Sequence, residues 1–157
     1  MKIKLKENLL NSFLSVAALS AVIFAVVFSF IYQKRWIGVI FLIIGFIHLL
    51  VLKLFRIKVK AVLPDIIFGV IDNGILVIAA IIGAGFAGVL GAIIGGGAAN
   101  AVTDGSAGIF EGWTAEYLRK HRIEEKRTVL SASIGKMAGC FFGAAIILII
   151  AWTILAL

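Results

Sequence analysis

The stretch that decides the fold runs from Pro64 to Leu118 and reads PDIIFGVIDNGILVIAAIIGAGFAGVLGAIIGGGAANAVTDGSAGIFEGWTAEYL. It is long enough to cross a bilayer twice, because a membrane-spanning helix needs about 20 apolar residues. Twelve of the 17 glycines lie in it, and no charged residue separates Asp72 from Asp104. We therefore expect two helices joined by a tight, glycine-rich turn near Gly85 to Gly91.

The rest of the chain is equally apolar. Its 157 residues are 62% hydrophobic and only 15% charged, and no linker or low-complexity segment separates a soluble domain. The first apolar run is too long for a signal peptide and lacks a small-x-small cleavage pattern at its end. The sequence predicts an all-α integral membrane protein, one domain with about five transmembrane helices over residues 9–32, 37–54, 64–86, 90–117 and 129–156.

The basic residues account for the net charge of +7 and predict an orientation. With the N-terminus in the cytoplasm, the inner segments carry three Lys or Arg residues at the N-terminus, four after the second span and five after the fourth span. The outer segment between the first two spans carries two, and Lys136 is left inside the last span. We therefore expect a multi-pass protein of the cell membrane with a cytoplasmic N-terminus. Its positive charge then reflects topology and contact with membrane lipid, and no nucleic-acid partner is expected.

Small and polar residues recur every four positions along the expected fourth span, at Gly88, Ala92, Gly96, Asn100, Asp104, Gly108 and Gly112. This spacing places them on one face of a helix, which a neighbouring helix can approach closely. For the glycines alone, helix packing is a sufficient explanation.

The carboxylates require a further explanation. An acidic residue near the centre of a spanning helix costs about 2.5 to 3.5 kcal/mol unless it pairs, protonates or faces water. Two explanations need no function: Lys136 neutralises Asp72 or Asp104 in an ion pair, or Glu111 lies near the hydrated interface. Alternatively, Asp72, Asp104 and Glu111 line a shared path with the amides of Asn73 and Asn100. Such oxygen ligands suit a divalent cation, whose binding displaces protons.

Two other side chains have simpler explanations. His48 is alone on an apolar span, where it is expected to form an interhelical hydrogen bond. Cys140 is the only cysteine, which excludes an intrachain disulfide.

Two segments resemble the vacuolar iron transporter family. Ile66 to Gly74, IIFGVIDNG, is similar to the signature of that family's first helix. Ala99 to Gly105, ANAVTDG, followed by Glu111 and by Glu116-Tyr117-Leu118, is similar to its second helix. The resemblance covers about residues 64–118.

The resemblance implies that Asp72 lines a metal and proton path, with Glu111 or Glu116 near its cytosolic mouth. It also implies a homodimer with the path between subunits, which exchanges ferrous iron or manganese for protons and holds no tightly bound cofactor. The chain departs from the family at Ala107-Gly108, where serine-methionine is common, and in having two additional spans before the matched region.

Two other functions were considered. Asp104-Gly105 is similar to the start of the motif of membrane CDP-alcohol phosphotransferases, but neither the following arginine nor the closing pair of aspartates is present. We therefore expect no enzyme and no catalytic residues. The alternative to transport is a non-transporting membrane module that uses the Gly/Ala-rich helix face to form oligomers or to bind a partner.

Overall fold

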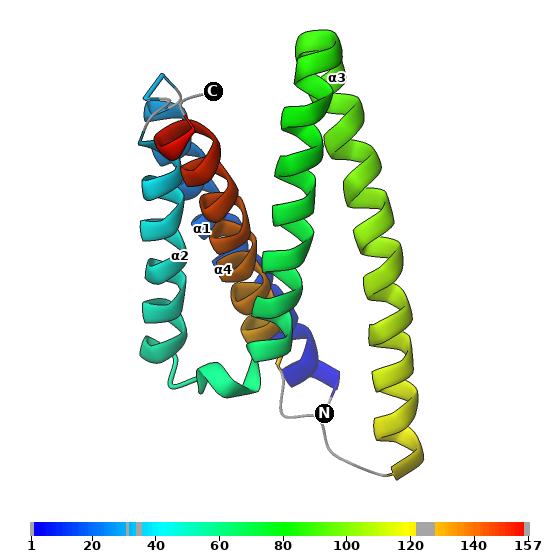
Figure 1. Ribbon diagram of the computed structural model, residues 1–157. Coiled ribbons are helices and arrows are strands. Elements are labelled where there is room, and N and C mark those ends of the chain that lie inside the picture. The colour runs from blue at the N-terminus through cyan, green and yellow to red at the C-terminus, as the bar shows by residue number, and fades with distance from the viewer. Residues whose placement is uncertain (1, 31, 34–35, 122–127, 156–157) are drawn as a thin grey trace.

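The structure is a computed structural model that describes residues 2–30, 32–33, 36–121 and 128–155. These residues form helices connected by short segments, and they contain no strand (Figure 1). In chain order the elements are α1 (Lys2–Ser29), α2 (Ile37–Leu54), the short 3-10 helix η1 (Val59–Ala61), α3 (Leu63–His121), α4 (Val129–Leu148) and the π-helical segment η2 (Ile149–Ile154). The predicted all-α class is confirmed for these residues.

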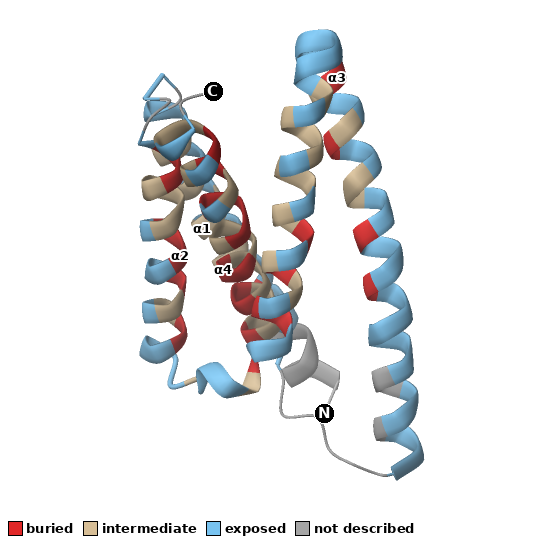
Figure 2. Cartoon of the chain, in the orientation of Figure 1, coloured by how far each residue is buried: buried red, intermediate tan, exposed pale blue. Residues whose placement is uncertain are grey.

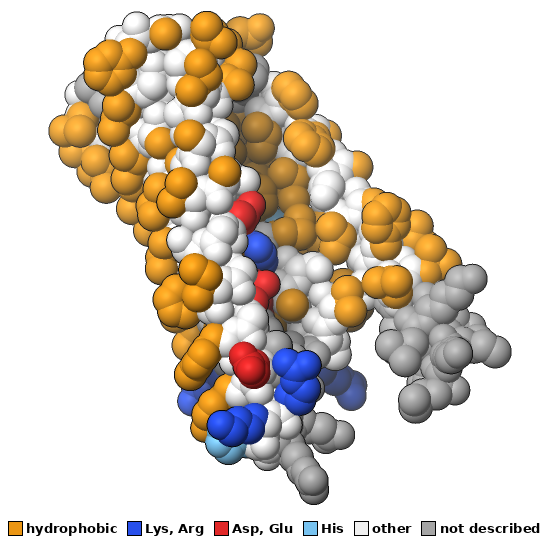
Figure 3. Space-filling model, turned by 90° about the vertical axis from the view of Figure 1, so that its right-hand side faces the viewer, with side chains coloured by type: hydrophobic (Ala, Val, Ile, Leu, Met, Phe, Trp, Pro, Cys, Tyr) orange, Lys and Arg blue, Asp and Glu red, His pale blue; other side chains and the backbone are white. Residues whose placement is uncertain are grey.

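Four helices in the described parts of the chain are long and apolar enough to cross a membrane. Their apolar segments are Leu9–Ser29, Ile37–Leu54, Leu63–Trp113 and Val129–Ile154. Large apolar side chains cover much of the outer surface in Figure 3, and Phe86 is 88% exposed. An apolar exterior of this extent suits contact with lipid, so the structure supports a multi-pass membrane protein.

α3 is a helical hairpin rather than one straight helix (Figure 1). Its first arm, residues 63–86, and its second arm, residues 89–121, run antiparallel and meet at Ala87 and Gly88, whose backbone angles are not helical. Gly88 has a φ of 58°, a conformation that glycine adopts without the penalty a side chain would add. The tight turn predicted between Gly85 and Gly91 is therefore present.

The two arms touch most closely beside the turn. A Cβ atom on Gly83 or Gly91 would overlap the backbone of the other residue, and one on Gly95 would overlap the Ala79 carbonyl group. By contrast, a Cβ on Gly105 or Gly112 would meet no atom within 4 Å. Within the predicted stripe itself, a Cβ on Gly88, Gly108 or Gly112 would meet no atom within 4 Å, and one on Gly96 would make an ordinary contact with Ala80. The close contacts on the second arm lie one residue away from the stripe, at Gly91 and Gly95.

A second glycine series forms the contact between α4 and the first arm of α3. Gly135, Gly139 and Gly143 lie four residues apart, and Cβ atoms on the last two would overlap the carbonyl oxygens of Ile66 and Val70. Without side chains, the two backbones can approach directly. This is the most extensive contact between elements in the described chain, and the sequence analysis did not identify it.

α4 is the central helix of the molecule. It begins with a capping box, in which the Ser131 amide donates to Thr128 Oγ1 over 3.1 Å and the Thr128 amide donates to Ser131 Oγ over 2.8 Å. Buried residues gather along α4 and on the helix faces toward it (Figure 2), including the apolar cluster of Leu52, Val62, Ile66 and Ile134. Leu19 of α1 packs against this cluster, and the second arm of α3 contributes no described residue to it.

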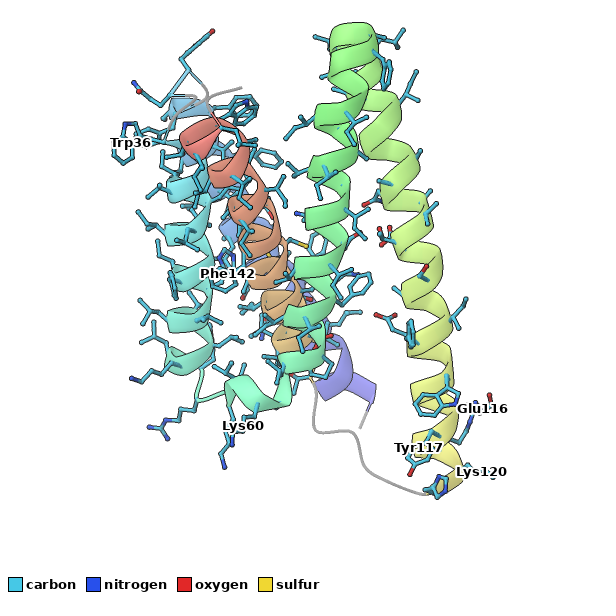
Figure 4. All side chains as sticks on the ribbon, in the orientation of Figure 1. Trp36, Lys60, Glu116, Tyr117, Lys120 and Phe142 are labelled. Carbon is cyan, nitrogen blue, oxygen red and sulfur yellow. The ribbon has the colours of Figure 1, made fainter. Side chains whose placement is uncertain are left out.

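The ends of the helices and their connections lie at two opposite ends of the molecule. The start of α1, η1 and the end of α3 lie at one end of the molecule, where Figure 4 labels Lys60, Glu116 and Lys120. Trp36 and the α3 turn lie at the opposite end. The described parts of the inner segments of the predicted topology therefore share one end.

The glycine contact between α3 and α4 predicts a difference between two matched substitutions. Gly139→Ala should lower the free energy of unfolding by about 1 to 3 kcal/mol, because its Cβ would force the Ile66 backbone away. Gly74→Ala meets open space and should leave stability unchanged or raise it by up to about 1 kcal/mol, since alanine favours helix. Thermal unfolding in detergent measures both, and equal effects would contradict the described packing.

Candidate functional site

Asp72 is the most enclosed of the predicted site carboxylates. It lies on the first arm of α3 and is only 5% exposed. Its Oδ1 accepts a hydrogen bond from the hydroxyl of Thr103, on the second arm. A carboxylate in an apolar hairpin is thus held by a donor from the opposite arm, and the bond links the arms well below the turn.

Thr103 was missed by the sequence analysis, although the turn position identifies it. Asp72 lies fifteen residues before Ala87, and Thr103 lies fifteen residues after Gly88. In an antiparallel hairpin, residues equally distant from the turn lie side by side. The exact turn position was needed, because a shift of one residue turns a helical side chain by about 100°.

Asn73 faces a different neighbour. Its Nδ2 donates to the backbone carbonyl of Cys140 on α4 over 3.2 Å. Adjacent side chains therefore connect the first arm of α3 to two helices, Asp72 to the second arm and Asn73 to α4. The Asn73 amide nitrogen contributes to helix packing, and its side-chain oxygen is left as the potential metal ligand.

Asn100 and Asp104 form a pair on the second arm. Asn100 Nδ2 donates to Asp104 Oδ2 over 2.9 Å, one helical turn apart, and Asp104 is exposed. Glu111 is also exposed and lies seven residues after Asp104, on the same side of the helix. Figure 3 shows acidic and basic side chains in a row along this side of the molecule, between two hydrophobic ridges.

Glu116 lies at the end of the second arm in an aromatic environment. With Trp113, Tyr117, Lys120 and His121 it lines a cavity of about 210 Å³. The Trp113 and Tyr117 rings are stacked at 5.6 Å between centroids, and the Tyr117 and His121 rings are 4.2 Å apart. Aromatic rings beside charged groups are typical of the membrane interface, so Glu116 is expected at the membrane-surface end of the second arm rather than at the depth of Asp72.

Lys136 does not form the ion pair considered in the sequence analysis. Its Nζ lies 4.5 Å from the centroid of the Phe68 ring, a cation–π contact, rather than against a carboxylate. With Ser20 on α1 and Ser133 and Cys140 on α4, Lys136 also lines a mostly apolar cavity of about 430 Å³.

His48 differs from its expected interhelical role. It is 1% exposed, and its Nδ1 lies 2.8 Å from the Ile44 carbonyl oxygen of its own helix. Its ring packs at 5.4 Å from that of Phe141 on α4, and Nε2 has no hydrogen-bond partner among the described residues. The contact with α4 is therefore made by ring packing.

The predicted metal ligands do not converge within one chain. In residues 2–30, 32–33, 36–121 and 128–155, no three His, Cys, Asp or Glu side chains are grouped so that they could hold a metal ion. Asp72 lies inside the hairpin, Asn73 contacts α4, and Asn100, Asp104 and Glu111 share one side of the second arm, where Asp104 and Glu111 are exposed. Among the predicted site residues, the described chain thus presents one enclosed carboxylate, Asp72, and a separate pair of exposed ones, Asp104 and Glu111.

Comparisons with known protein families, with curated proteins and with solved structures found no match to this chain. The relationship to vacuolar iron transporters therefore stays a prediction from the two sequence segments.

The bond between Thr103 and Asp72 predicts a stability effect. Thr103→Val keeps the side-chain shape but removes the donor, which should lower the free energy of unfolding by about 1 to 3 kcal/mol. Thr103→Ser should restore most of the loss. Ser106→Ala is the control, because Ser106 is exposed and its hydroxyl bonds only to Val102 of its own helix. Thermal unfolding measures these effects, and equal stability of Thr103→Val and wild type would contradict the bond.

Proposed function

We propose that this chain crosses the membrane five times, with the two arms of α3 as separate spans and the N-terminus in the cytoplasm, and exchanges a divalent cation for protons. The transported ion is ferrous iron or manganese, as the family resemblance implies. The excess of Lys and Arg in the segments that share one end of the molecule supports the orientation.

The burial of Asp72 is the observation that carries this proposal. An ionisable side chain at membrane depth is costly and usually marks a path for ions or protons. Asp72 lies in an apolar hairpin, and its hydrogen-bond partner among the described residues is the neutral hydroxyl of Thr103. A carboxylate so placed is suited to bind either a proton or a metal ion, and competition between the two couples their movements.

The distribution of the other carboxylates supports a homodimer. Asp104 and Glu111 are exposed on the second arm, so the chain's own helices do not cover them. In a dimer, a second copy covers these groups and adds its own oxygen ligands to those of Asn100 and Asp104. The path then lies between two subunits, each of which contributes carboxylates.

A second candidate function has its own supporting observation. Gly105, Gly108 and Gly112 face open space, since a Cβ on any of them would meet no atom within 4 Å. A small-residue face of this kind accommodates another helix at close range. On this alternative the chain is a non-transporting module, and its polar residues only fix the register of assembly.

Replacement of one oxygen tests the transport proposal. Asp72→Asn keeps an oxygen that can accept the Thr103 hydrogen bond but removes the charge, so uptake of ferrous iron or manganese should fall at least tenfold while the protein remains folded. The measurement is metal uptake into proteoliposomes with an imposed pH gradient, with proton movement recorded in the same vesicles.

Ser106→Ala serves as the matched control on the same hairpin and should transport like wild type. Uptake that is unchanged in Asp72→Asn would exclude Asp72 from the path. No uptake by folded, inserted wild-type protein would contradict transport of these metals and favour the second candidate.

The second candidate makes a separate prediction about assembly. Gly108→Leu places a large side chain on the open glycine face and should shift the protein toward monomer in light scattering of the detergent-solubilised chain. Ser106→Leu is the control, because residues two positions apart point to opposite sides of a helix. If both variants keep the oligomeric state of wild type, this face is not used for assembly.

A further inference from the structure

We propose that Lys136 is a built-in counter-cation for the carboxylates of α3, with which an entering metal ion must compete. The inference rests on the proposed function and identifies the residue that makes the path select between divalent and trivalent cations.

Lys136 lies at membrane depth. It is in the first third of the apolar segment Val129–Ile154 and is half-buried. Its ammonium group rests against the face of the Phe68 ring. An aromatic face attracts a cation but does not neutralise its charge. The ammonium group therefore lies beside the hairpin with an aromatic ring, rather than a carboxylate, as its partner.

The ammonium group lies close to the level of Asp72. Phe68 precedes Asp72 by four residues on the first arm, so the two side chains share one helix face and are separated by one turn, about 5 to 6 Å between Cβ atoms. The backbones are in contact at the same level, because Gly69 packs against the Lys136 carbonyl group and the Cys140 amide. A four-carbon stem with freely rotating bonds spans one helical turn.

The cavity of about 430 Å³ that Lys136 lines lies between α1 and α4 and is bordered by no described residue of α3, so it does not lead toward the carboxylates. The approach of the ammonium group to Asp72 is instead a change of rotamer within the one-turn reach of the lysine side chain.

The charge of the lysine explains its role. Lys136 places one positive charge about one helical turn from Asp72, the enclosed carboxylate that the proposed function assigns to the ion path. Because electrostatic repulsion is proportional to the charge of the entering ion, Lys136 opposes a trivalent ion more strongly than a divalent one. The residue therefore favours divalent over trivalent cations.

Two charge variants of Lys136 test this role. Lys136→Gln should tighten Mn²⁺ binding at least about tenfold and Tb³⁺ binding at least about thirtyfold. The reason is that the repulsion energy which the substitution removes is proportional to the charge of the ion, which is two for Mn²⁺ and three for Tb³⁺. Lys136→Arg keeps the charge and should stay within about threefold of wild type for both ions. Arg119→Gln, which removes a positive charge at the exposed end of α3, is the control. Binding is measured by Mn²⁺ electron paramagnetic resonance and by Tb³⁺ luminescence on the purified full chain.

A metal-free measurement separates failure of this inference from failure of the proposed function. Lys136→Gln and Asp72→Asn should each lower the Tm, and the double variant should lose at least about 3 °C less than the sum of the two. Asp104→Asn replaces Asp72→Asn in the cycle if the latter does not fold. Additive Tm changes would overturn the counter-cation role.

The metal-binding outcomes are equally decisive. Unchanged or weaker binding of both ions by Lys136→Gln would overturn the competition. If neither wild type nor Lys136→Gln binds Mn²⁺, the proposed function and the competition both fail, whereas a non-additive Tm cycle would still support Lys136 as the internal counter-cation.

Discussion

The backbone contact between α4 and the first arm of α3 is the constraint on which the rest of the structure depends. Gly139 and Gly143 let the two helices approach until backbone meets backbone. In a membrane, where lipid is as apolar as the side chains, such close packing replaces the hydrophobic effect as the source of association. With the first arm fixed on α4, the turn at Gly88 determines where the second arm begins.

Much of the fold could be predicted because hydropathy and glycine content act locally. The bounds of α2 and the position of the α3 turn required only an apolar run of sufficient length and a residue that tolerates a positive φ. The partner of each glycine could not be predicted in the same way. Glycines spaced four residues apart show that one helix face carries small residues, but two helices of this chain have such a face. Only the three-dimensional arrangement shows that α4 packs its glycine face against another helix, whereas the second arm of α3 leaves most of its glycine face open.

The candidate site was predictable to a smaller extent. Acidic residues in an apolar run are conspicuous in sequence, so Asp72 and Asp104 were found, but their environments differ for reasons that sequence spacing does not contain. Asp72 bonds to Thr103 on the opposite arm, and Asp104 bonds to Asn100 on its own arm. Lys136 was equally conspicuous, yet its contact with Phe68 depends on the register between α4 and the hairpin.

The two-residue turn at Ala87 and Gly88 has a mechanical consequence. The arms touch beside the turn and diverge toward their far ends (Figure 1), so a small angular change at the turn is amplified along the second arm. With a rise of 1.5 Å per residue, a rotation of about 5° displaces Thr103 by roughly 2 Å and Glu116 by roughly 4 Å. A displacement of 2 Å is enough to break a hydrogen bond. The position of the membrane-surface end of α3 and the bond to Asp72 are therefore geometrically coupled, with the glycine turn as the pivot.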